Sequence, residues 1–184
     1  MPKIGILLGS LRKESFSKKI AANVAALFPK GYETEIVEIG NLPLYNQDFD
    51  DENNVPAEYT AFRNTMKEID AVLFVTPEYN RSVPAVLKNA LDVGSRPYGA
   101  SVWNAKPAAI ISQSPGNLSA FGANHHLRQS LVFLNMPIVQ QPEAYIGNVA
   151  ALLDENGKIK DEKTVQFLQS FADAFVDLIK KFQS

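Results

Sequence analysis

The run A-V-L-F-V-T at residues 71–76 is the most strand-like part of this 184-residue chain. Five of its six residues are apolar, two of them are valine, and Pro77 ends the segment. A short apolar run without polar alternation is typical of a strand that is covered on both faces, as in a parallel sheet. Two other runs have the same character, I-G-I-L-L at residues 4–8 and A-A-I-I-S at residues 108–112. These three runs predict the centre of a parallel sheet.

Segments with edge-strand and helical patterns lie between and beyond these runs. Residues 34–39 alternate polar and apolar side chains, which suits a strand near a sheet edge, and residues 136–139 indicate a short fifth strand. Helices are expected at residues 18–28, 58–69, 83–92, 120–134 and 164–182. Strands that alternate with helices predict a doubly wound α/β fold, with helices on both faces of the sheet. Nothing in the composition divides the chain, so we expect one domain over residues 1–184.

Three other segments are interpreted as structural. Residues 41–56 are polar and rich in turn formers, so we expect a long excursion there. The sequence D-E-N-G at residues 154–157 predicts the turn of a small hairpin. The last helix carries an apolar stripe that we interpret as core packing, formed by Leu168, Phe171, Phe175, Leu178 and Phe182.

The composition excludes several classes of function. The chain has no cysteine, which rules out disulfide scaffolds, thiolate metal sites and thiol chemistry. Its net charge of −2 lacks the positive footprint of a nucleic-acid-binding protein, so no such partner is expected. No signal-peptide pattern follows Met1, and no apolar run approaches the about 20 residues of a membrane span. We therefore expect a cytoplasmic protein that does not bind a membrane.

The loop after the first strand, residues 9–17 (G-S-L-R-K-E-S-F-S), has the strongest chemical signal. It has one glycine and no Gly-Lys-Ser/Thr, so it matches neither the dinucleotide fingerprint nor the P-loop. It does place three hydroxyls and Arg12 ahead of a helix N-terminus, whose free N–H groups favour an anion. Ser10, Ser15 and Ser17 can donate hydrogen bonds, and Arg12 can meet phosphate oxygens as a planar fork. The loop predicts a phosphate monoester site; a capping serine beside a solvated arginine is the alternative.

Two further loops follow strands at the same edge of the predicted sheet. Residues 76–84 (T-P-E-Y-N-R-S-V-P) offer an aromatic ring, an amide and backbone groups, a set that suits a flat heteroaromatic ligand. Residues 112–120 (S-Q-S-P-G-N-L-S-A) are small and turn-forming, which lets backbone approach a ligand. Both loops are equally consistent with ordinary turns, and Ser82 is expected to cap the following helix. Because such sheets bind ligands beyond the carboxyl ends of their strands, we expect the three loops to form one crevice.

No hydrolytic or metal-binding arrangement accompanies these loops in the sequence. There is no Ser–His–acid set, and no loop offers an aspartate nucleophile beside a metal site. The neighbouring His125 and His126 point about 100° apart on a helix, so they cannot chelate one ion. We expect no metal site, and we expect both histidines at the surface or at an interface.

Two motifs carry a family resemblance. The first is G-S-L-R-K-x-S-F-S at residues 9–17, and the second is P-E-Y-N-x-S-x-P-x-x-L-K-N-A-x-D at residues 77–92. With H-L-R-Q-x-L-V-F-L at residues 126–134 and the pair Pro142-Glu143, they resemble the NADPH-dependent FMN reductase family, in its quinone, chromate and azo-dye reductase branch. The resemblance implies a flavodoxin-like sheet of five parallel strands in the order 2-1-3-4-5.

The resemblance also implies a cofactor and the residues that hold it. FMN would be bound non-covalently, with its phosphate gripped by the serines and the arginine of the first loop. The second loop would line the isoalloxazine ring, and the third loop would approach the ring through one serine. The implied cofactor-binding residues are Ser10, Arg12, Ser15, Phe16, Ser17, Pro77, Glu78, Tyr79, Asn80 and Ser114. No side chain is expected to act as a catalyst, because hydride transfer is the chemistry of flavin N5.

The implied activity is that of an NAD(P)H oxidoreductase. We expect NADPH or NADH to deliver hydride, which passes via bound FMN to quinones, azo compounds, free flavin or similar acceptors in a ping-pong cycle. A homodimer or homotetramer is also implied. The alternative is a flavodoxin-type FMN electron carrier without direct NAD(P)H turnover. Such carriers tend to be strongly acidic, and the net charge of −2 counts against this alternative.

The chain departs from the family pattern at two places. Ser17 stands where asparagine is common, which shortens the side chain but keeps a donor. Ser119-Ala120 and Gly122 stand where the family often has a Gly-Gly pair and a following arginine. Arg81 and Arg96 are candidates for a 2′-phosphate contact, but we interpret both as solvated surface charges.

Overall fold

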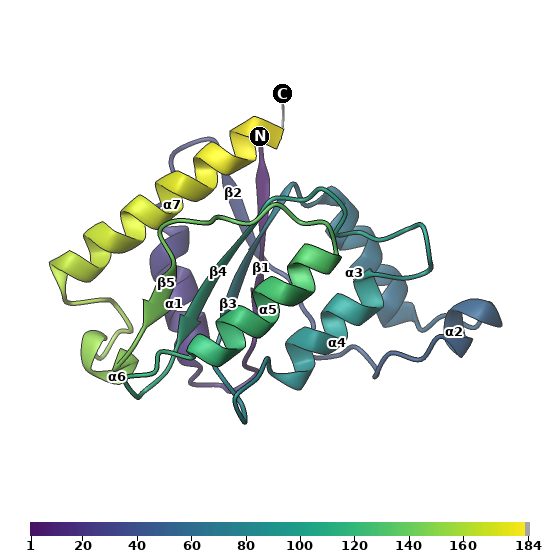
Figure 1. Ribbon diagram of the computed structural model, residues 1–184, viewed down its shortest axis with the longest axis horizontal. Helices are drawn as coiled ribbons and strands as arrows, with labels where there is room; N and C mark the ends of the chain where they lie inside the picture. The colour runs from purple at the N-terminus through teal and green to yellow at the C-terminus, as the bar shows by residue number, and fades with distance from the viewer. Residues whose placement is uncertain (183–184) are drawn as a thin grey trace.

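The structure is a computed structural model that describes residues 1–182 (Figure 1). Its strands are β1 (Lys3–Leu8), β2 (Glu33–Ile36), β3 (Ala71–Thr76), β4 (Ala108–Gln113) and β5 (Ala144–Ile146). Its helices are α1 (Phe16–Ala25), α2 (Asp48–Asp51), α3 (Ala57–Glu68), α4 (Ala85–Gly94), α5 (Phe121–Phe133), α6 (Val149–Leu152) and α7 (Glu162–Phe182).

The five strands form one parallel sheet in the order β2-β1-β3-β4-β5. Every residue of β3 and β4 is buried, as expected for unbroken apolar runs that are covered on both faces. The strand order reverses beside β1, where the chain crosses from β2 to β3. The expected flavodoxin-like fold is therefore confirmed, and its ligands are expected beyond the carboxyl ends of β1, β3 and β4.

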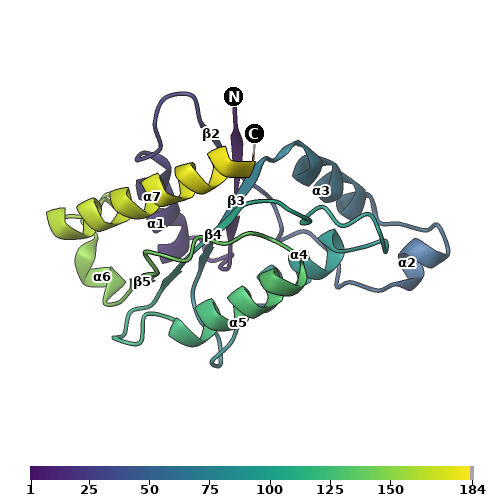
Figure 2. The ribbon, with the colours of Figure 1, turned by 45° about the horizontal axis from the view of Figure 1, so that its top comes forward.

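Helices cover both faces of the sheet. Helices α1 and α7 lie on one face, and α3, α4 and α5 lie on the other (Figures 1 and 2). The side chains of β3 alternate between the two faces of the sheet. Val72 and Phe74 pack in the core formed with α3, α4 and α5, whereas Leu73 and Val75 pack in the core formed with α1 and α7. This alternation explains why the strand has no polar residue before its end.

The apolar stripe of α7 is core packing for most of its length. Leu168, Phe171 and Phe175 are fully buried, and Leu178 packs partly buried against the same cluster. Phe182 is 51% exposed, so the prediction is wrong at the last residue of the stripe.

The fifth strand lies at residues 144–146, not at residues 136–139 where the sequence predicts it. Residues 136–139 run beside the start of β4, but only Ile138 forms a bridge there, with Ala108. Pro137 has no N–H and therefore cannot donate to a ladder. The chain joins β4 further along, where Ala144 pairs with Ile111.

Two helices begin at other residues than the sequence predicts, because residues outside the apolar pattern of the helix decide where each one starts. Helix α1 begins at Phe16, earlier than predicted, because Ser15 caps it, and it ends at Ala25. Pro84 stands at the N-cap of α4, so the prediction that Ser82 caps this helix is wrong. The turn at residues 154–157 is confirmed and lies inside a bridge between Leu153 and Ile159.

The excursion at residues 41–56 contains the short helix α2 and is anchored to the core by a buried ion pair. Arg63 of α3 contacts both carboxylate oxygens of Asp50, at 2.6 and 2.7 Å. The same guanidinium donates through Nε to the carbonyl of Val93, at 3.0 Å. Long polar segments need such anchors, because they bury little apolar surface of their own.

Candidate functional site

The loops after β1, β3 and β4 meet at a pocket of about 220 Å³. Gly9 makes this meeting possible, because a Cβ at residue 9 would collide with Oγ1 of Thr76 and lie 3.0 Å from Cδ of Pro77. The pocket is lined by Ser10, Arg12, Ser15, Phe16, Pro77, Glu78, Tyr79, Gln113, Ser114 and Pro115. The structure thus brings together most of the residues that the sequence singles out; Ser17 and Asn80 lie beside this set.

The first loop is organised around the cap of α1. The hydroxyl of Ser15 accepts a hydrogen bond from the backbone N–H of Lys18, at 3.3 Å. The N–H groups of Phe16 and Ser17, in the first turn, have no acceptor within residues 1–182. Arg12 is exposed and forms no ion pair within the same residues. Two free amides at a helix N-terminus beside a free guanidinium make a site for an anion.

The hydroxyls of two serines of the first loop accept hydrogen bonds from protein groups. Ser17 is fully buried, and its hydroxyl accepts a hydrogen bond from Nε2 of Gln113, at 3.0 Å. The hydroxyl of Ser10 accepts from the backbone N–H of Arg12, at 3.4 Å. Ser17 therefore presents its backbone N–H, rather than its side chain, at the first turn of α1.

Gln113 is a site residue that the sequence reading missed. It is the last residue of β4 and is nearly buried, at 3% exposure. Its Oε1 is buried and has no hydrogen-bond partner within residues 1–182, although the side chain lines the pocket. Polar residues at the carboxyl end of a strand that begins with four apolar residues are the signal that could have identified it.

The second loop forms a two-residue hairpin turn. Tyr79 and Ser82 exchange two backbone hydrogen bonds, at 3.1 and 3.0 Å. The central residues Asn80 and Arg81 both have positive φ, 51° and 65°, as a type I′ turn requires. The Tyr79 side chain is 47% exposed. The turn therefore presents an aromatic ring and an amide beside the pocket.

The third loop is stabilised by hydrogen bonds between residues of the same segment. The hydroxyl of Ser114 donates to the carbonyl of Gly116, and that of Ser112 donates to the carbonyl of Ser119, both at 2.8 Å. Ser119 and Ala120 are both left-handed, with φ of 54° and 57°. These are the positions where the family often has two glycines, so the chain keeps the backbone conformation without the residue that favours it.

The predicted surface positions of the two histidines are confirmed. Both side chains are exposed on α5. His125 Nε2 lies 2.9 Å from the hydroxyl of Tyr145, and His126 Nδ1 lies 3.0 Å from the hydroxyl of Ser82. Burial and Glu143 raise the pKa of Tyr145 to about 12, so this hydroxyl stays protonated at neutral pH.

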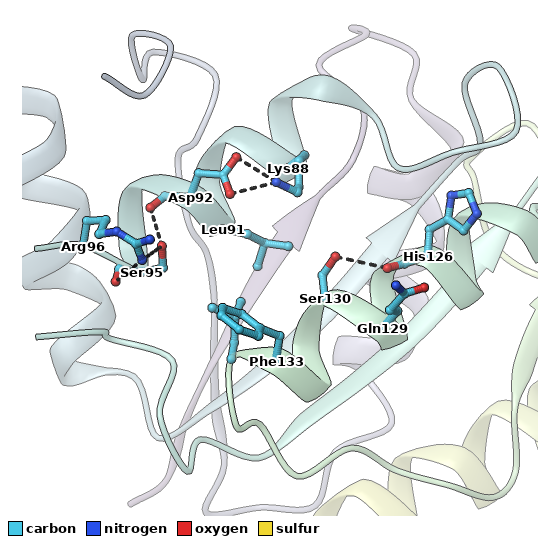
Figure 3. A pocket seen from close by; sticks show the side chains of 10 residues that line it. Lys88, Leu91, Asp92, Ser95, Arg96, His126, Gln129, Ser130 and Phe133 are labelled. Carbon is cyan, nitrogen blue, oxygen red and sulfur yellow. Dashed lines mark hydrogen bonds and ion pairs between the residues drawn. The ribbon is translucent and has the colours of Figure 1, made fainter. Parts of the chain in front are cut away.

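A groove of about 680 Å³ between α4 and α5 is larger than the pocket of the three loops (Figure 3). The polar side chains at and just after α4 already have protein partners: Lys88 bonds both carboxylate oxygens of Asp92, and Ser95 donates to the backbone carbonyl of Asp92. Phe133 lies at the groove and is 85% exposed. The groove therefore combines polar side chains that are engaged with protein partners and an apolar part formed by Leu91, Phe133 and Leu134.

Comparison with known proteins identifies relatives along nearly the whole chain. A quinone reductase of Pseudomonas putida is 54% identical over 177 residues, which cover 96% of this chain and 94% of that protein. A 2-hydroxy-1,4-benzoquinone reductase of a Burkholderia species is 44% identical over 178 residues, which cover 97% and 96%. The structure of FerB, a flavoenzyme NAD(P)H:(acceptor) oxidoreductase from Paracoccus denitrificans, aligns with a TM-score of 0.92 at 40% identity and covers 99% of both chains.

The family is established by the sequence and the fold together. The model of the NADPH-dependent FMN reductase family matches residues 2–151, which include all three loops of the crevice. The sheet order and the free helix N-terminus at the first loop agree with that match. The chain therefore belongs to the NADPH-dependent FMN reductase family.

Proposed function

We propose that this chain is a single-domain quinone reductase that holds FMN in the crevice of the three loops. Family membership makes it an FMN-dependent oxidoreductase that uses NAD(P)H. The choice of quinones as acceptors rests on the names of the most similar relatives. The observation that carries the placement of FMN is the first turn of α1, where the free N–H groups of Phe16 and Ser17 lie beside Arg12.

The residues of the crevice fit FMN at both ends. A phosphate dianion would satisfy the two free amides and the guanidinium of Arg12. The buried Oε1 of Gln113 needs a donor, which a hydroxyl of the ribityl chain would supply. Tyr79 and the pyrrolidine ring of Pro77 offer apolar surface for a flat ring, and Asn80 offers amide hydrogen bonds.

The chain's own residues bind and orient, and they do not need to transfer a proton. Bound FMN supplies hydride chemistry at its N5 atom. Arg12 neutralises the phosphate, and the cap of Ser15 keeps the first turn of α1 formed around it. The turn at residues 79–82 is rigid because two backbone hydrogen bonds close it. A ping-pong order, in which donor and acceptor use one open face in turn, is part of this proposal.

A visible absorption spectrum and a turnover assay test the function. The purified protein, or the protein incubated with FMN and desalted, is expected to show flavin absorbance and to oxidise NADPH or NADH when benzoquinone is added. A protein that binds FMN but is reduced only through a partner protein would support the electron-carrier alternative. A protein that takes up no FMN would contradict the proposal.

For the oligomeric state, we propose self-association of a second copy through the groove between α4 and α5. Phe133 of α5 lines this groove and is 85% exposed, and its neighbour in the sequence, Val132, is 69% exposed. A seam of two helices that leaves such residues uncovered is typical of a surface that buries against its own symmetry mate. A homotetramer would need a second surface in addition.

Sedimentation of F133E and F182E tests this surface. Phe182 ends α7 on the opposite face of the sheet and is also exposed, so it serves as the matched control. F133E is expected to sediment as a monomer at concentrations where the wild type and F182E are dimers. A dimer of unchanged strength in F133E would contradict the assignment of this surface.

A cytoplasmic location is proposed as well. Among residues 1–182, no helix combines the length and the apolar character needed to cross a membrane. Cell fractionation tests the location directly, with recovery in the soluble cytoplasmic fraction as the expected result.

A further inference from the structure

The carboxylate of Glu78 is directed from the second loop toward helix α5. Its Oε2 accepts a hydrogen bond from the backbone N–H of Ala123, at 3.0 Å. Ala123 is the third residue of α5, one of the positions whose N–H has no partner within the helix. The N-cap residue, Ala120, has no side-chain oxygen that could satisfy these groups. Glu78 therefore caps α5 from another segment of the chain.

Gly122 leaves the space that this carboxylate occupies. A Cβ at residue 122 would lie 2.8 Å from Oε2 of Glu78 and 3.0 Å from the carbonyl oxygen of Arg81. The close approach of the second loop to α5 therefore uses the space that a side chain at residue 122 would fill.

A second contact joins the same loop to the same helix. The hydroxyl of Ser82 lies 3.0 Å from Nδ1 of His126, three residues after Ala123 and so on the same side of α5. One contact lies just before the turn formed by residues 79–82, and the other is made by the last residue of that turn. Arg81 also approaches Oε1 of Glu78, at 3.5 Å, but its side chain is 76% exposed, so this pair adds little.

We propose that Glu78 is a positioning residue, which holds the second loop against α5 in the shape that receives the isoalloxazine ring. This inference rests on the proposed function, because it concerns the ring end of the same crevice. The side chain of Glu78 is only 12% exposed, so its carboxylate needs the N–H of Ala123 as a partner. A loop that is ordered before the ligand arrives binds more tightly than one that must be ordered by it.

Binding of riboflavin and FMN to the apoprotein, followed by flavin fluorescence, tests the proposal. Riboflavin lacks the phosphate and reports on the ring end alone. E78A is expected to lower the affinities for riboflavin and FMN by the same factor, about tenfold. This factor corresponds to the loss of one hydrogen bond to a charged group. E78Q keeps an oxygen that accepts from Ala123, so it is expected to restore both affinities to within about threefold of the wild type.

The outcomes separate this inference from the proposed function. If the wild type binds neither flavin, the proposed function fails. If the wild type binds FMN while E78A binds riboflavin and FMN as tightly as the wild type, or if E78Q is as weak as E78A, the positioning role of Glu78 is wrong.

A second variant covers the case that E78A does not fold. G122A adds a methyl group where the carboxylate lies and favours the helix, so it is expected to fold and to weaken riboflavin binding. Unchanged riboflavin binding by a folded G122A would overturn the proposal as well.

Discussion

The first and second loops of the crevice are stabilised by contacts of different range. The first loop depends on neighbours in sequence: Ser15 caps its own helix, and the free amides belong to the next two residues. The second loop depends on a helix more than forty residues further along the chain, which Glu78 and Ser82 contact. The cap and the free amides of the first loop are therefore set by local contacts, although Gln113 also bonds Ser17 from the third loop, whereas the shape of the second loop is a product of tertiary packing.

Removal of the Arg12 guanidinium should have the largest effect on FMN binding, and it should affect only the phosphate site of the first loop. R12A is expected to weaken FMN binding by about 1.5–3 kcal/mol, the usual worth of a hydrogen bond to a charged group. Riboflavin binding should not change, because riboflavin has no phosphate. Fluorescence titration of the apoprotein measures both, with K13A as the control for a neighbouring exposed charge. If R12A lowered the affinities for FMN and riboflavin equally, the division of the crevice into a phosphate end and a ring end would be wrong.

Loss of the cap tests the local character of the first loop. S15A is expected to lower the free energy of unfolding of the apoprotein by about 1 kcal/mol, because the N–H of Lys18 loses its acceptor at a helix end. Urea unfolding provides the measurement. S170A is the control, since Ser170 is exposed within α7 and its hydroxyl donates to the carbonyl of Phe167 in the same helix; its effect should stay within about 0.5 kcal/mol. A stability loss in S170A as large as that in S15A would remove the special role of the cap.

A glycine at residue 81 tests whether the turn of the second loop is strained, and its expected effect on stability is the smallest of the three. R81G replaces a residue at φ 65° and creates the Asn-Gly pair that type I′ turns favour, so the free energy of unfolding should rise by about 0.5–1 kcal/mol. R81A loses the same exposed side chain but keeps a Cβ, so it should give no such gain. Thermal unfolding of the two apoproteins compares them directly. Equal stability of R81G and R81A would show that the turn stores no strain at residue 81.

The central strands and the free helix N-terminus of the first loop could be predicted from the sequence, because both depend on short stretches. The apolar runs at residues 4–8, 71–76 and 108–112 all became central strands. The short run at residues 136–139 did not become a ladder, since its pairing depends on where the chain meets β4. The apolar pattern of a segment alone does not predict which of its residues pair with β4.

The contacts of the crevice that join distant segments could not be predicted from the sequence. Nothing in the local sequence of Gln113 indicates its bond to Ser17, 96 residues away. The same holds for Glu78, whose partner is a backbone N–H of α5. Glycine at position 122 was visible as a departure from the family, but its meaning required the position of the carboxylate.

Backbone amide shifts of the isotope-labelled apoprotein, recorded during a titration with FMN, test the central claim most directly. The account predicts the largest shifts at Phe16 and Ser17, whose N–H groups would take the phosphate, followed by the turn at residues 79–82. Inorganic phosphate should reproduce the first set alone. Shifts that centre on the groove of Lys88, Gln129 and Phe133, with Phe16 and Ser17 unmoved, would contradict it.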